Sequence, residues 1–266
     1  MAKEQARARG KDEGAGAGPA RRASDRGRYG RLSRERVLAS ALDLVDREGL
    51  SALSMRRLGA ELGVEAMALY RYAASKDALL DGLVEALHLE LEEGLASPGP
   101  GLSTKAATAA AVEAEIAAEA PEWRAELHRI ARATYEVCLT HPQVVPLLAT
   151  RMLAVPLAQR PLAVLRHHER VLALLQGAAG LGDARSAAVF RAFTGWVLGY
   201  VSVELQAMVD SPEESDPAFR LGLHRMPPLE LPRLREAAAG LAERGGPEGL
   251  AAGLDALLDR FTRPQE

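Results

Sequence analysis

Apolar residues recur at helical spacing through this chain from Ser33 to its end, and no run of alternating β-branched residues interrupts them. Residues three and four apart share one face of an α-helix, whereas a half-buried strand needs strict alternation. The chain has 266 residues, enough for one large or two modest domains. The spacing therefore predicts an all-α protein.

A glycine separates two short helical segments near the front of this pattern. Ser54 is a favourable N-cap for the first segment, and Gly63 tolerates the left-handed backbone that ends it. The second segment is predicted at about residues 65–74. A longer helix ending at Gly49 comes before the pair, and another begins after the N-cap Ser75. This order predicts a helix-turn-helix, although any small three-helix bundle is compatible with it.

The net charge of −3 hides an uneven distribution of charge. The first 76 residues carry 16 Lys and Arg against 10 Asp and Glu, and the rest of the chain carries 17 against 26. A basic front indicates a polyanionic partner at the N-terminal end. Residues 1–30 have no apolar periodicity, and we expect them to form a disordered basic arm.

Cysteine usage and motifs exclude several classes of protein. Cys138 is the only cysteine, which rules out an internal disulfide or a multi-thiolate metal site and favours a reducing, cytoplasmic location. No apolar run approaches the roughly 20 residues of a membrane span. GxSxG, HExxH, P-loop and GxGxxG motifs are absent, so we expect neither an enzyme nor a cofactor. His167 and His168 precede Glu169, but consecutive helical residues point apart, and we expect no metal.

The run LSMRRLGAELGVEAMALYRYAASKDALL, residues 53–80, resembles the signature of the tetracycline-repressor (TetR) family of bacterial transcription regulators. The resemblance covers roughly residues 31–92. The back half is similar more loosely to the tetracycline repressors, through His141-Pro142 and Leu198-Gly199. It implies a helix-turn-helix DNA-binding domain at 31–76, linked by a helix at 75–95 to a helical effector-binding and dimerisation domain at 77–266.

The resemblance also implies a homodimer that places two recognition helices in successive major grooves of a palindromic operator. Tyr70 and Lys76 match phosphate-contacting residues of the family, and Arg56 matches a residue that reaches a guanine edge. The DNA-contacting set implied by position is Ser54, Met55, Arg56, Ala66, Met67, Ala68, Tyr70, Arg71, Tyr72 and Lys76.

Met67 and Ala68 cannot donate hydrogen bonds at the base-facing positions. Two interpretations stay open: they pack against a thymine methyl, or they are small enough to let the helix sit deep while arginines touch phosphates. The arginines before the first helix also have two interpretations, as a minor-groove arm or as a solvated tail. These arginines are Arg21, Arg22, Arg26, Arg28 and Arg31.

The back half is predicted to hold helices at 121–140 and 157–176, an Ala-rich helix at 103–120 and an apolar helix from Asp183. Because the last of these is apolar around most of its circumference, we expect it to form an intersubunit four-helix bundle with the C-terminal helix, rather than to be buried in one subunit. Polar and aromatic residues inside this domain are candidate ligand contacts. They are Trp123, His128, Tyr135, Arg151, His168, Trp196, Tyr200 and Glu204.

This chain departs from the tetracycline repressors at the positions of their metal-linked ligand residues, where it has Leu148, Val203 and Glu92. An apolar or aromatic effector therefore fits better than magnesium-tetracycline. The sequence favours a ligand-responsive repressor that releases a palindromic operator on binding an apolar small molecule. The alternative is a dimeric DNA-binding regulator controlled by a partner protein. A buried cavity of several hundred Å³ would favour the small molecule.

Overall fold

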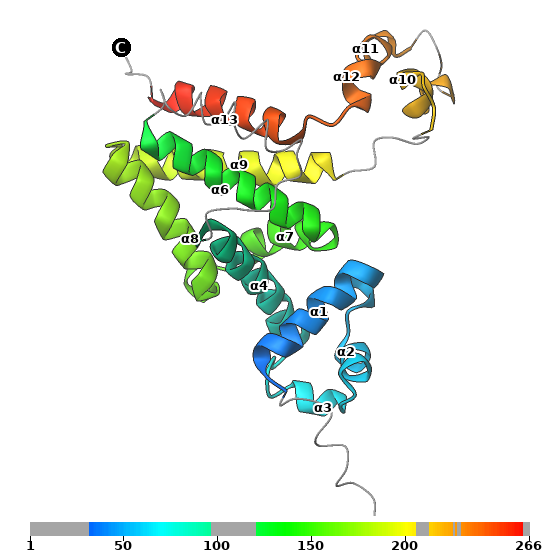
Figure 1. Ribbon diagram of the computed structural model, residues 1–266, viewed down its shortest axis with the longest axis vertical. Coiled ribbons are helices and arrows are strands. Elements are labelled where there is room, and N and C mark those ends of the chain that lie inside the picture. The colour runs from blue at the N-terminus through cyan, green and yellow to red at the C-terminus, as the bar shows by residue number, and fades with distance from the viewer. Residues whose placement is uncertain (1–31, 97–120, 206–212, 226, 228–229, 263–266) are drawn as a thin grey trace, which may run out of the picture. The chain divides into compact units, whose positions relative to one another are not determined.

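Every element in the described part of the chain is a helix or a helical turn, as the apolar spacing predicts (Figure 1). The protein is therefore all-α. The arm predicted at 1–30 and the helix predicted at 103–120 lie outside the described residues. The computed structural model describes residues 32–96, 121–205, 213–225, 227 and 230–262.

The first three helices, between Arg34 and Leu69, form a small unit that we call the head. Ser54 accepts a hydrogen bond from the Arg57 backbone N–H at 3.1 Å, and Gly63 ends the second helix at a φ of 67°. Both features confirm the predicted cap and turn. The three helices are α1 (Arg34–Glu48), α2 (Met55–Leu62) and α3 (Ala66–Leu69).

The turn between α2 and α3 depends on a second glycine. A Cβ on Gly59 would lie 2.8 Å from the Val64 carbonyl oxygen, so α2 and α3 approach too closely there for any side chain. Helix α3 is also shorter than predicted. After Leu69 the chain continues as a turn, in which the Leu69 carbonyl accepts hydrogen bonds from the N–H groups of Tyr72 and Ala73.

Helix α4 (Lys76–Ala96) links the head to the back half of the protein. The Ser75 hydroxyl caps it by accepting from the Ala78 N–H at 3.0 Å, as predicted. Gly82 packs so closely against Leu38 of α1 that a side chain there would collide with it. Because α4 also packs against helices of the back half, it can carry a displacement between the two ends of the molecule.

The back half contains eight further α-helices within the described residues. The predicted helix at 157–176 begins later, because Arg160 precedes Pro161 and takes an extended backbone at φ −73° and ψ 150°. The eight helices are α6 (Glu122–Thr140), α7 (Val145–Ala154), α8 (Leu162–Ala173), α9 (Asp183–Glu204), α10 (Pro217–Arg220), α11 (Pro232–Glu236), α12 (Ala238–Ala242) and α13 (Gly246–Thr262). Short 3-10 turns occupy Leu50–Ala52, Pro142–Val144, Leu157–Gln159 and Leu223–Arg225, and a π-turn at Leu174–Ala178 continues α8.

Helix α9 is the longest helix of the described chain. By length and composition alone, α9 could cross a membrane. Within the protein, 28% of its most apolar 18-residue stretch is buried. One side packs against α6, α7 and α13, which lie beside it in Figure 1. The opposite side exposes a line of residues four apart, at Arg191, Gly195, Gly199 and Val203. One chain therefore leaves part of this apolar helix uncovered.

Candidate functional site

The end of the head presents the short helix α3 to solvent. Met67 is 75% exposed and Tyr70 is 43% exposed, while Leu69 between them is fully buried. Arg71 is exposed as well, and Ala66 is half-buried. Leu69 therefore anchors the helix to the head and leaves the adjoining side chains free to meet a partner.

Cationic side chains flank this helix. Arg56 and Lys76 are exposed, and within the described part of the chain neither makes an ion pair or a side-chain hydrogen bond. Ser54 is exposed, but its hydroxyl caps α2. Met55 differs from the expectation, because the start of α2 turns its side chain into the core, where it is 8% exposed.

The remaining members of the predicted interface are less exposed or are not described. Ala68 and Tyr72 are half-buried beside Met67. The five arginines proposed for the arm lie outside the described residues. An apolar tip flanked by cationic groups is suited to a groove whose floor carries methyl groups and whose rims carry phosphates.

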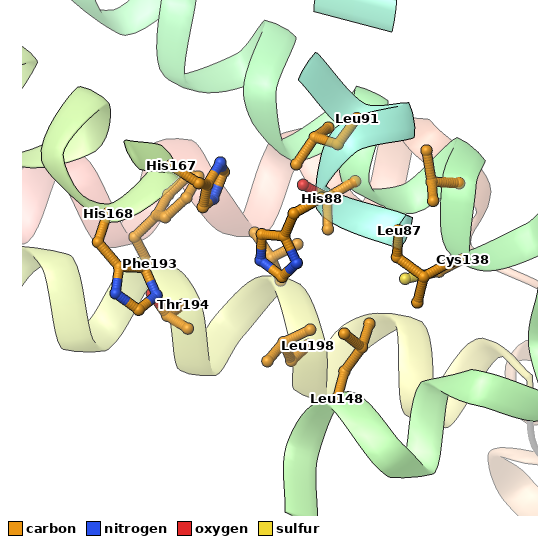
Figure 2. A pocket seen from close by; sticks show the side chains of 13 residues that line it. Leu87, His88, Leu91, Cys138, Leu148, His167, His168, Phe193, Thr194 and Leu198 are labelled. Carbon is orange, nitrogen blue, oxygen red and sulfur yellow. The ribbon is translucent and has the colours of Figure 1, made fainter. Parts of the chain in front are cut away.

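A second candidate site lies inside the back half. It is a small, partly open, apolar cavity of about 50 Å³, lined by side chains of α4, α6, α7, α8 and α9, as Figure 2 shows. This volume is far below the several hundred Å³ of a preformed ligand site and holds only a few water molecules. The lining residues are Leu87, His88, Leu91, Thr134, Val137, Cys138, Leu148, His167, His168, Phe193, Thr194, Val197 and Leu198.

Three histidines line the cavity, together with the two threonines named above. Burial lowers the pKa of His167 to about 3 and that of His168 to about 4, and it also lowers the pKa of His88. The rings of His88 and His167 are 5.5 Å apart, edge to face. The buried Nδ1 atoms of His167 and His168 have no hydrogen-bond partner. An unpaired buried polar atom is costly, and among the described residues these two nitrogens are the buried polar side-chain atoms of the cavity lining that lack a partner.

Cys138 also lines the cavity but offers no reactive group. Burial raises the pKa of its thiol to about 12, so the sulfur stays protonated. No group of three or more His, Cys, Asp or Glu side chains suited to a metal ion occurs among the residues that the structure describes. The cavity is therefore lined by apolar side chains with a few groups that can form hydrogen bonds.

Of the eight predicted ligand residues, His168 alone lines the cavity. Four others form a separate cluster between α6, α9 and α13. Tyr200 donates to the Gly246 carbonyl at 2.7 Å, and the Trp196 indole donates to the Leu250 carbonyl at 3.1 Å. Glu204 accepts from the Gly245 N–H at 2.9 Å, and Tyr135 donates to it at 3.5 Å. The polar groups of these four side chains are thus hydrogen-bonded to one another or to the backbone at and just before α13. The cluster therefore joins helices.

The remaining three candidates are also held outside the cavity. Arg151 of α7 pairs with two aspartates of α4, donating to Asp81 at 2.8 Å and to Asp77 at 3.1 Å. His128 of α6 lies 2.8 Å from Asp255 of α13. Trp123 is half-buried, and the guanidinium of the next residue lies 5.3 Å from the centre of its ring.

The sequence reasoning missed His88 and His167 as cavity residues. His88 stands beside Leu87 and one turn before Leu91 on the apolar side of α4, where an ionisable residue is unusual. That position was the available signal. His167 was considered only with its neighbour for a metal site, although its side chain also reaches the cavity.

Family models match two stretches of the chain. "Bacterial regulatory proteins, tetR family" matches residues 37–83, and "Tetracyclin repressor-like, C-terminal domain" matches residues 117–259. The second stretch covers more than half of the chain. Together they include most of the head, the exposed helix α3 and most of the helices that line the cavity.

Two curated relatives are transcription regulators from actinobacteria. An HTH-type transcriptional regulator of Saccharopolyspora erythraea is 31% identical over 173 residues, which are 65% of this chain and 61% of that protein. The HTH-type transcriptional repressor DrrR1 of Streptomyces coeruleorubidus is 30% identical over 184 residues, 69% of this chain and 58% of that protein. The chain thus spans about three-fifths of the length of these relatives.

Solved structures share the fold at lower identity. A possible TetR family regulator of Streptomyces coelicolor has a TM-score of 0.62 at 24% identity, covering 87% of this chain and 100% of that chain. ActR of the same organism, in complex with actinorhodin, has a TM-score of 0.61 at 21% identity, covering 86% and 95%. BioQ with its operator DNA has a TM-score of 0.53 at 21% identity, covering 88% and 100%.

These matches agree with the architecture of the described residues. An exposed short helix after a glycine turn ends the head, and a helical back half encloses a cavity. The family consists of transcription regulators rather than enzymes. The chain belongs to the TetR family of bacterial regulatory proteins.

Proposed function

We propose that the protein is a dimeric transcription regulator of the bacterial cytoplasm, which binds a palindromic operator and releases it when a small molecule enters the back half. The observation that carries the DNA-binding part is the exposed tip of α3 with Met67 and Tyr70, in a head whose cations Arg56 and Lys76 are exposed and make no ion pair among the described residues. A helix of this kind fits the major groove, and flanking cations contact phosphates. Among proteins of the same fold, BioQ has been solved with its operator.

The uncovered side of α9 supports the dimer. Gly195 and Gly199 are exposed, and a Cβ at either position would meet no atom within 4 Å in one chain. Small residues four apart allow the backbone of a second helix to approach closely. A partner's α9 and α13 packed on this side would complete a four-helix bundle and would space two heads for successive major grooves.

The unpartnered imidazoles support a small-molecule effector. His167 and His168 bury Nδ1 atoms that a ligand hydroxyl, amide or carbonyl would satisfy. The cavity of about 50 Å³ must expand to admit such a ligand. Its small size is the observation that favours the alternative, in which a partner protein controls the regulator and no ligand binds. ActR, of similar fold, has been solved with actinorhodin.

Selection of binding sites from genomic DNA tests the proposal. We expect a palindromic site with one dimer bound to each site. The logarithm of the binding constant should fall steeply and linearly with the logarithm of the salt concentration. An effector that binds the released state should change operator affinity about 5- to 150-fold, and operator should change effector affinity by the same factor. Binding without sequence preference would contradict the regulator function.

A further inference from the structure

A cleft of about 420 Å³ lies between α4 and α6. Its lining includes Glu90, Glu93 and Glu136 and no basic side chain. Two of its lining residues, Leu91 and Val137, line the buried cavity as well. The cleft and the cavity are therefore neighbours, and Leu91 and Val137 lie at the boundary between them.

The carboxylates of the cleft differ in how far they are already paired. Glu136 accepts from Arg132 at 3.1 Å, and Glu90 lies 2.9 Å from Nε2 of His141. Glu93 is exposed and has no hydrogen bond or ion pair among the described residues. Within the described chain, one carboxylate of the cleft lining therefore has no partner, and it offers a favourable position for a cation.

The cavity beyond Leu91 and Val137 is lined by uncharged side chains, unlike the acidic cleft. His168 is 7% exposed, its Nδ1 has no partner, and it lines the cavity. The neutral imidazoles and the surrounding leucines disfavour any charge there, because desolvating an ion costs far more than one hydrogen bond returns. The cavity therefore suits a neutral body with one or two hydrogen-bonding atoms.

We propose that the cavity and the cleft form one site for an amphiphilic cation, whose apolar, aromatic body enters the cavity while a protonated amine stays among the cleft carboxylates. This inference rests on the proposed function, because it names the class of effector. Leu91 and Val137 turn aside as the body enters, and the combined space reaches the several hundred Å³ that ligand sites occupy.

The same cleft is connected to the head. His141 lies between Glu90 of α4 and Asp46 of α1, with its Nδ1 2.7 Å from the Asp46 carboxylate. The imidazole of His141 thus contacts a carboxylate of α4 through one ring nitrogen and a carboxylate of α1 through the other. An ammonium group that pairs with Glu90 competes with His141. Binding in the cleft thereby loosens a contact that holds α1 of the head.

Three probes that share one ring system test the site on the full-length protein: naphthylpropylamine, naphthylpropanol and naphthylpropionic acid. Calorimetry at low salt should show the amine binding about ten-fold tighter than the alcohol, because it gains a charge-assisted hydrogen bond, and the acid binding most weakly. Equal affinities, tightest binding of the acid, or no binding of any probe would overturn the inference.

Variants locate the binding. Glu93→Gln should lower the amine-to-alcohol affinity ratio about three-fold, while Glu122→Gln, an exposed glutamate outside the cleft, should leave it unchanged. Gly94→Leu should weaken both probes, because a Cβ at Gly94 meets no atom within 4 Å and a leucine would fill the cleft. Gly240→Leu, at an equally open glycine elsewhere, is its control. Unchanged binding in Gly94→Leu would overturn the assignment.

Operator binding is measured on the same samples. If no probe binds while the operator is still recognised, the effector class is wrong and the proposed regulator stands. If the operator itself is not recognised, the proposed function fails whatever the probes do. The amine, but not the acid, should weaken operator binding, and release by the acid alone would overturn the inference.

Discussion

Arg56 and Arg57 are neighbours in the sequence with different surroundings in the fold. Arg57 forms an ion pair with Glu48 of α1 and lies 3.6 Å from Glu61 of α2. The hydrogen bond to Glu48 raises the pKa of Arg57. Arg57 thus joins two helices of the head, whereas Arg56 is exposed and unpaired in the described chain. We therefore expect Arg56, rather than Arg57, to contact DNA.

Arg56→Ala and Lys76→Ala should weaken DNA binding in different ways. Loss of a bidentate contact to guanine should cost about 1 to 3 kcal/mol at one base pair and relax specificity there. Loss of a phosphate contact by Lys76 should weaken binding to every sequence alike and reduce the salt slope by about one. Binding to a panel of operator variants separates the two. A uniform loss for Arg56→Ala would contradict its base-reading role.

Among the elements, α4 is tied by ion pairs to three neighbours. Arg34 of α1 pairs with Glu85, and Arg170 of α8 pairs with Glu92 at 3.0 Å. Arg151 of α7 holds the two aspartates near the N-terminus of α4. Each pair is partly exposed, so each contributes modestly to stability. Together they hold α4 against its neighbours, and the proposed ligand between α4 and α6 or α8 would shift α4 against these contacts.

The neutral histidines between α4 and α8 should make stability pH-dependent. Burial, then the neighbouring His88, lowers the pKa of His167 from 6.5 to about 3. Between these values the unfolded chain binds a proton that the folded chain does not, so the free energy of unfolding falls as pH drops below 6.5. One such proton corresponds to about 1.4 kcal/mol per pH unit.

Urea unfolding of His167→Gln at several pH values measures that contribution. The slope of unfolding free energy against pH, between about pH 4 and 6, should be smaller than in the wild type by up to one proton. The carboxylates titrate in both proteins and cancel in the difference. His224→Gln, at an exposed histidine remote from the cavity, serves as the control. Identical slopes for His167→Gln and wild type would contradict a neutral His167.

Sequence reasoning succeeded where local chemistry decides an element. The caps at Ser54 and Ser75 and the turn at Gly63 depend on a few adjacent residues, and all three were predicted. The cavity depends instead on which faces of five helices meet. Trp196 and Tyr200 fitted the composition of a ligand site, but tertiary packing places them against α13. A single sequence shows which face of each helix is apolar, but it does not show which other helix packs against that face.

For the whole molecule, the exposed line on α9 predicts the assembly. Gly199→Glu adds a side chain that one chain accommodates, because a Cβ there meets no atom within 4 Å. If α9 packs on a partner, the same change buries a charge in the interface, which is costly. Sedimentation equilibrium should show a monomer, and operator affinity should fall. Gly240→Glu, at an open glycine outside α9, should remain dimeric. A dimeric Gly199→Glu protein would contradict this interface.

The glycines of α13 limit how this protein can be engineered. A designer seeking thermostability would replace helical glycines with alanine, which ordinarily gains about 1 kcal/mol each. At Gly249 the new methyl would collide with the hydroxyl of Tyr200, and at Gly253 with the ring of Trp196. Both aromatic residues sit on α9, so the substitutions would push α13 away from it. Glycine at these two positions leaves room for the aromatic side chains of α9, and so it determines how closely α9 and α13 pack.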